Sequence, residues 1–300
     1  MLGVAVGVAG IAFVVRTLVT RWTEVTDAFA GIEPLPLLAS LAVGLLAMTI
    51  IGAVWVGLLQ SRGHHAPRSR AMAWYYVGQL GKYVPGGIWP IVGRAELAVR
   101  GGVPRADAYK ATAFSLVTTY AAATVAVAAG SFLSVSRLPV GAAVVACLAA
   151  AWFVLGSPRV AGLVGSAAAR VTSRSISLPD RGQFTRLTLV HVPAWVLMSL
   201  STSITAHAFG ARIGTADMLF VTSLSWLAGF VVVGVPGGIG VRESVFTALA
   251  GGIVGTPVAV SLALASRVVF ILVDLSGALL STLVAGAART GRTGAASAEL

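Results

Sequence analysis

Charged side chains stand inside apolar sequence near the end of the chain. Arg267 and Asp274 lie seven residues apart within the apolar run 258–286. Seven residues make two helical turns, so both side chains lie on one face of a helix. A charge at the bilayer centre costs roughly 2.5–3.5 kcal/mol, so such residues face a bundle interior and mark a functional pathway. The alternative is a structural ion pair that ties this helix to Arg242 or Glu243.

The sequence Val-Pro-Gly-Gly-Ile occurs at residues 84–88 and again, 151 residues later, at residues 235–239. One Pro costs about 3 kcal/mol and each Gly about 1 kcal/mol inside a helix, so roughly 5 kcal/mol opposes a continuous helix at each place. A membrane tolerates broken backbone only where protein or a water-filled cavity covers it. Paired breaks in two halves of a chain indicate a transporter-like binding site.

The second break carries groups suited to an anion. Arg242 and Glu243 follow Gly240, where a new half-helix is expected to begin. The free N–H groups and about half a positive charge at that helix N-terminus would, together with Arg242, form a seat for phosphate. Lys82, three residues before Pro85, is expected to approach the same depth from the other break.

Aromatic residues and a second charged pair surround the first break. Trp74 and Tyr75 fit an aromatic belt at the membrane interface. Arg94 and Glu96 fit a pair near the cytoplasmic surface, where long side chains snorkel toward water. The full set of residues predicted to bind substrate is Lys82, Tyr83, Pro85, Gly86, Gly87, Trp89, Arg94, Glu96, Pro236, Gly237, Gly238, Gly240, Arg242, Glu243, Arg267 and Asp274.

The composition is that of a polytopic membrane protein. Of 300 residues, 57% are hydrophobic and only 10% charged, against about 25% charged residues in a soluble domain. We attribute the net charge of +11 to basic residues that set the membrane topology and attract anionic lipids, and we expect no nucleic-acid partner. The single cysteine excludes disulfides within the chain. We expect no metal site and no cofactor, because no ligand cluster and no nucleotide-binding motif is present.

Hydropathy predicts one all-α transmembrane domain over residues 1–300, with about six full spans and two re-entrant hairpins broken at Pro-Gly-Gly. The predicted spans are about 2–20, 35–59, 108–134, 138–156, 187–209 and 258–286, and the interrupted segments are about 68–104 and 216–256. The glycine-rich tail after residue 290 is expected to fray.

Basic residues set the orientation, because short loops rich in Lys and Arg stay in the cytoplasm. The first interrupted segment has basic residues at both ends, so it should enter from the cytoplasm and return there. The second interrupted segment should enter the membrane from outside and return outside. Hairpins from opposite faces predict an inverted repeat, with halves at about 35–134 and 187–286 and a basic connector at about 157–186. Both termini are expected in the cytoplasm of a cell-membrane protein.

At these residues the chain resembles the lysylphosphatidylglycerol synthase transmembrane-region family, which is flippase-like. The resemblance is carried by residues 53–59 and 81–89, by Pro-Gly-Gly-x-Gly-x-Arg-Glu at 236–243, and by Arg267. It covers nearly the whole chain and implies movement of a lipid with a charged or glycosylated headgroup between leaflets. We expect no synthase activity, because the soluble aminoacyl-transferase domain of that family's synthases is absent from this sequence.

Three functions are compared. The first is a lipid translocase for an anionic or glycosylated phospholipid, or for a polyprenyl-phosphate-linked headgroup. The second is a membrane partner or scaffold of a separate glycosyltransferase or aminoacyl-transferase. An enzyme ranks last, because Glu24 and Asp27 are not organised into a catalytic pair. The expected partners are therefore membrane lipids and, in the second case, a transferase.

Overall fold

The computed structural model describes residues 33–64, 66–84, 88–133, 137–155, 181–232 and 238–298, together with a few isolated positions between 16 and 27. These residues form α-helices and one short 3-10 helix, and they contain no β-strand. The predicted class, an all-α membrane protein, is confirmed. Apart from positions 16, 19 and 20, the predicted span 2–20 lies outside the described residues, as do residues 157–180 of the predicted connector.

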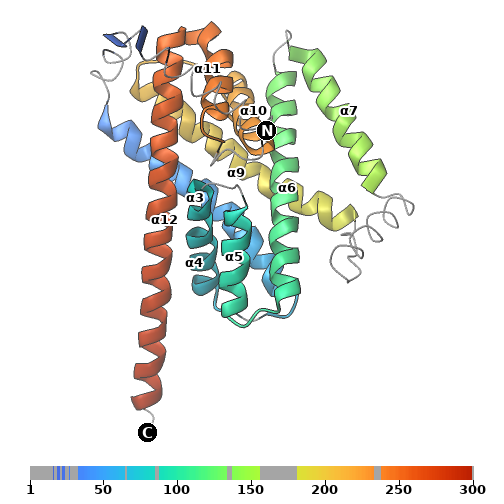
Figure 1. The fold of residues 1–300 in the computed structure, drawn as a ribbon, viewed down its shortest axis with the longest axis vertical. Helices are drawn as coiled ribbons and strands as arrows, with labels where there is room; N and C mark the ends of the chain where they lie inside the picture. The colour runs from blue at the N-terminus through green and yellow to red at the C-terminus, as the bar shows by residue number, and fades with distance from the viewer. Residues whose placement is uncertain are drawn as a thin grey trace.

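Within the described residues, four helices are long and apolar enough to cross a membrane. They are α3 (Pro34–Gln60), α6 (Arg105–Phe132), α9 (Arg181–Ala208) and α12 (Thr256–Ala298). Their positions match four of the six predicted spans. α9 begins earlier than expected, inside the predicted connector. α12 continues through the tail that was expected to fray, and at 1.5 Å per residue it is about 65 Å long. Its C-terminal end therefore extends well beyond the bundle (Figure 1).

The predicted span 138–156 is a shorter helix at the edge of the molecule. α7 (Leu138–Leu155) has 18 residues, near the lower end of the roughly 17–25 that a transmembrane helix needs. It packs against α6 and lies at the periphery (Figure 1). The six full spans of the prediction are thus represented by four such helices in the part of the chain that the structure describes.

The two interrupted segments form helical pairs. The first pair is α4 (Arg68–Gln79) and α5 (Trp89–Arg100), with the 3-10 helix η1 (Leu80–Tyr83) after α4. The second pair is α10 (Thr215–Val231) and α11 (Val241–Val254). In both pairs the first helix ends five or six residues before the proline of the Pro-Gly-Gly motif, and the second helix begins two or three residues after the last glycine. The local cost of Pro and Gly in a helix accounts for this placement.

The arms of each pair run antiparallel and touch through glycine. A Cβ atom on Gly78 would lie 2.7 Å from the Cα of Arg94, and one on Gly238 would lie 2.8 Å from the Cα of Gly229. Gly238 also has φ +67°, which side chains rarely adopt. Glycine at these positions lets the second arm fold back against the first, so each pair is a closed hairpin.

The core is built around the crossing of α3 and α9, which run obliquely through the bundle (Figure 1). Ser40 Oγ donates to the carbonyl of Ser201 at 2.7 Å, and Ser201 Oγ donates to the carbonyl of Ser40 at 2.8 Å. Around this crossing, α4 packs against α12 and α10 packs against α6, while α5 packs against α6 and α11 against α12. Each hairpin is therefore held between α6 and α12.

Candidate functional site

A buried ion pair joins the tip of the first hairpin to α12. Lys82 Nζ lies 2.5 Å from Asp274 Oδ2, and the Tyr83 hydroxyl donates to the same oxygen at 2.5 Å. Asp274 is fully buried, and the Lys82 side chain is only 11% exposed. Water therefore cannot easily replace either partner, so the two charges depend on each other.

A second ion pair joins the second hairpin to the same helix. Arg267 Nη1 donates to Glu243 Oε1 at 2.5 Å, and Glu243 Oε2 accepts the backbone N–H of Gly240 at 2.7 Å. Glu243 thus caps the N-terminus of α11, where a carboxylate is favoured by the helix dipole. At the predicted phosphate seat on this helix end, Glu243 takes the N–H of Gly240, and the positive charge that forms no ion pair among the described residues is that of Arg242.

Arg242 is buried against aromatic rings. Its Cζ lies 3.8 Å from the centroid of the Trp226 ring and 5.5 Å from that of Phe270. No acidic side chain among the described residues forms an ion pair with Arg242. The Trp226 Nε1 donor is also buried and has no hydrogen-bond partner among these residues. Cation–π contact stabilises the guanidinium here but leaves its charge unneutralised.

Arg94 occupies a similar environment in the first hairpin. It is 4% exposed, its Cζ lies 4.5 Å from the Tyr75 ring centroid, and its Nη2 donates to Gln79 Oε1 at 2.7 Å. The interpretation of Arg94 and Glu96 as a surface pair is therefore wrong. Residues two apart on a helix point to nearly opposite sides, so Glu96 faces outward and pairs with Arg105 at 2.5 Å.

The aromatic-belt interpretation also fails for the first hairpin. Tyr75 is 1% exposed and Trp74 is 9% exposed, because both lie on faces of α4 that are covered by other helices. Tyr75 packs against Trp55 of α3, at 6.2 Å between ring centroids. These rings are part of the core that surrounds the cationic groups.

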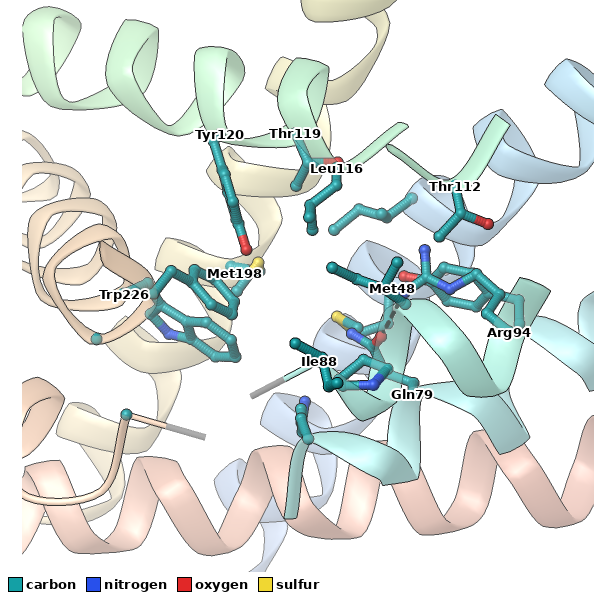
Figure 2. A pocket seen from close by; sticks show the side chains of 18 of the residues that line it. Met48, Gln79, Ile88, Arg94, Thr112, Leu116, Thr119, Tyr120, Met198 and Trp226 are labelled. Carbon is teal, nitrogen blue, oxygen red and sulfur yellow. Dashed lines mark hydrogen bonds between the residues drawn. The ribbon is translucent and has the colours of Figure 1, made fainter. Parts of the chain in front are cut away.

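A cavity of about 320 Å³ lies between the two hairpins, α3, α6 and α9. Figure 2 shows Arg94 and Trp226 on opposite sides of it, with Thr119 and Tyr120 of α6 along one wall. Lys82 lines both this cavity and a smaller one of about 20 Å³ next to Arg242 and Arg267. A space of that size holds a single water molecule. The described walls of the larger cavity contain no acidic side chain.

The structure brings together six of the predicted site residues at the hairpin tips, namely Lys82, Tyr83, Arg242, Glu243, Arg267 and Asp274. Gly238 and Gly240 lie at the start of α11, and Arg94 lines the large cavity. Trp89 is 45% exposed and, like Glu96, lies outside that cavity. The remaining predicted residues, Pro85, Gly86, Gly87, Pro236 and Gly237, lie outside the described residues.

Sequence reasoning did not identify Gln79, Tyr75, Tyr120 or Trp226 as wall residues of the cavity. A signal for two of them was present. Tyr75 and Trp226 are 151 residues apart, as are Gly78 and Gly229, which is the same offset as between the two Pro-Gly-Gly motifs. Extending the repeat beyond the motif would have placed an aromatic ring and a glycine in equivalent positions of both hairpins.

The comparison with known protein families covers all the residues of the site. A family model described as "Lysylphosphatidylglycerol synthase TM region" matches residues 1–275. The matched range contains both hairpins and extends along α12 just past Asp274. No curated protein matches the chain.

Proposed function

The chain belongs to the lysylphosphatidylglycerol synthase TM region family, and on that premise we propose that it carries lipid headgroups between the leaflets of the cell membrane. Membership in this family indicates a lipid-related function in a membrane. The substrate class that we propose is an anionic or glycosylated phospholipid, or a polyprenyl-phosphate-linked headgroup. One observation carries the proposal: the buried cations Lys82 and Arg94 line a cavity of about 320 Å³, and Lys82 also lines the small cavity beside Arg242 and Arg267.

The physical difficulty of moving such a lipid is its headgroup, since an unpaired ionised group is very costly in hydrocarbon. Lys82 and Arg94 place positive charge on the walls of the large cavity, and Arg242, which forms no ion pair with a described acidic side chain, adds a charge at the adjoining small cavity. The walls of the cavity are mainly aromatic and apolar, so a charge-assisted contact is stronger there than at the surface. A phosphate held in this cavity therefore crosses the apolar layer with part of its charge compensated.

The two ion pairs provide a way for substrate binding to affect the position of the hairpins. Lys82 and Asp274 join the first hairpin to α12, and Glu243 and Arg267 join the second hairpin to α12. A hairpin can move along α12 only if its pair separates, which leaves buried charges unpaired at high cost. A phosphate that replaces the carboxylate beside Lys82 or Arg267 removes the part of this cost that falls on the cation, and it thereby couples headgroup binding to hairpin movement.

We further propose that the two hairpins are re-entrant and related by an inverted repeat, with both termini in the cytoplasm. Equivalent packing supports this arrangement, because α4 contacts α12 as α10 contacts α6, and α5 contacts α6 as α11 contacts α12. The shared offset of Tyr75 with Trp226 and of Gly78 with Gly229 supports it as well. In inverted repeats, substrate sites lie near the bilayer midplane between the two halves.

Reconstitution tests the proposal directly. The purified chain is placed in vesicles that contain acyl-labelled fluorescent phosphatidylglycerol, and dithionite is added outside to bleach the outer leaflet. We expect the protein to expose inner-leaflet label to bleaching, and we expect Arg242→Ala to slow this step at least about tenfold. Arg105→Ala is the matched control, since that side chain is 65% exposed and lies away from the cavity.

Protection of inner-leaflet label in wild-type vesicles with each of the proposed lipids would contradict the translocase function. Activity that appears only after a transferase is added would instead favour the partner role that the sequence left open. Equal rates for Arg242→Ala and Arg105→Ala would remove Arg242 from the site.

A further inference from the structure

The two hairpins each hold one arginine in the same structural setting. In the second hairpin, Arg242 lies against Gly229 and stacks on Trp226. In the first hairpin, Arg94 lies against Gly78 and stacks on Tyr75. Because the rings and the glycines are related by one offset, Arg94 is the structural counterpart of Arg242. The second hairpin simply reaches its arginine three residues sooner after the break.

The buried charges near the cavity do not balance. Lys82 and Arg267 each have a carboxylate partner, Asp274 and Glu243 respectively. Arg94 and Arg242 form no ion pair with an acidic side chain among the described residues. Two positive charges therefore remain in apolar surroundings, one in each hairpin. Such charges are normally paired or absent from a protein interior, so this excess indicates an anionic partner, and Arg94 is the arginine that this partner reaches from the large cavity.

Hydrogen-bond donors without partners on the cavity walls also favour an anion. Arg94 Nε and Trp226 Nε1 are buried donors with no partner among the described residues, and both residues line the cavity. The aromatic rings of the walls can contact a lipid ammonium group. The described walls nevertheless supply no acidic side chain, and they carry the cations Lys82 and Arg94, which repel an ammonium group. Phosphate oxygens and hydroxyl groups accept hydrogen bonds from these donors.

We infer that the cavity of about 320 Å³ selects a lipid headgroup that is net negative and has no ammonium group, and that Arg94 binds its phosphate. This inference rests on the proposed translocase function and narrows its substrate. It assigns Arg94 a specificity role and excludes the aminoacylated lipid after which the family is named. Zwitterionic lipids are disfavoured as well, because their ammonium group finds no counter-charge in the cavity.

The wild-type protein provides the first test. Vesicles carry acyl-labelled phosphatidylglycerol, phosphatidylcholine or lysyl-phosphatidylglycerol, and movement is followed by dithionite bleaching. We expect phosphatidylglycerol to move at least about tenfold faster than the other two. Equal rates for the three lipids, or the fastest rate for the lysyl lipid, would overturn the selectivity while leaving the translocase function standing. No movement of any lipid would instead refute the translocase function.

Substitution of the arginine tests its role separately. We expect Arg94→Gln to bind short-chain phosphatidylglycerol about ten- to a hundredfold more weakly in detergent, and to lose the preference over phosphatidylcholine. Arg94→Lys should restore part of the preference because it keeps the charge, and Arg105→Gln is the matched control outside the cavity. An unchanged lipid preference in folded Arg94→Gln would refute the assignment. If Arg94→Gln does not fold, the partial preference of Arg94→Lys and the three-lipid comparison still decide it.

Discussion

The ion pair between Lys82 and Asp274 gives a quantitative prediction. Removing one partner of a buried pair costs about 3–5 kcal/mol, because the other charge is left without compensation. Asp274 is fully buried and the Lys82 side chain is 11% exposed, so little water is available to replace the lost partner. We therefore expect Asp274→Leu and Lys82→Met each to lower the free energy of unfolding by about 3–5 kcal/mol.

The loss of stability in the double variant should be far smaller than the sum of the losses in the two single variants. It removes both charges and keeps similar volumes, and such replacements are often neutral. The Tyr83 hydroxyl, which donates to Asp274, then loses its acceptor at a cost of about 1–3 kcal/mol. We expect a coupling free energy of at least about 3 kcal/mol between the two sites, and Tyr83→Phe should recover most of the remaining loss.

Unfolding by SDS titration from mixed micelles, followed by tryptophan fluorescence, measures these free energies. The control is a cycle on Arg105 and Glu96, an exposed pair that should couple by no more than about 1 kcal/mol. Additive effects of the two single substitutions at Lys82 and Asp274, within about 0.5 kcal/mol, would refute the reasoning. The pair would then hold no energetic link between the first hairpin and α12.

Two further predictions follow from the second hairpin. Gly238→Ala should lower the free energy of unfolding by at least about 1–2 kcal/mol in the same titration, because Gly238 has φ +67° and lies against Gly229. The control is Gly252→Ala, in open space on α11, which should be neutral or stabilising; equal effects of the two substitutions would contradict this account of the turn. Trp226→Leu should slow lipid movement severalfold, since the cation–π contact with Arg242 contributes up to about 2 kcal/mol when desolvated. The dithionite bleaching assay measures this rate, and a wild-type rate for the variant would contradict a role for the Trp226 ring.

The positions of the hairpins could be predicted from sequence because the signal is local. Pro and Gly disfavour a helix through their own backbone chemistry, whatever surrounds them. The arms accordingly end and begin next to residues 84–88 and 235–239. The apolar runs that form α3, α6, α9 and α12 are local signals in the same sense. The length of α12 was underestimated because a composition rich in Gly, Ala and Ser does not by itself end a helix.

The burial and the final partners of the charged residues could not be fixed in this way, because they depend on which helix covers which face. Arg94 and Glu96 are adjacent in sequence to the same break, yet one lines the cavity and the other pairs at the surface. The ion pair between α12 and Glu243, which the sequence offered as an alternative, is present as the contact of Arg267 with Glu243, and Glu243 also caps α11. These outcomes follow from the packing of α5 against α6 and of α11 against α12.

By itself the sequence determined that this is an all-α membrane protein, where its helices break, and that Arg267 and Asp274 share one face of α12. These properties depend on hydropathy, helix propensity and helical periodicity, which act over a few turns of chain. Only the tertiary structure decided that Lys82 pairs with Asp274, that Arg94 and Arg242 remain without carboxylate partners among the described residues, and that a cavity separates the hairpins. Such pairings join residues up to about 190 positions apart, and the energy of a buried charge depends on what packing places beside it.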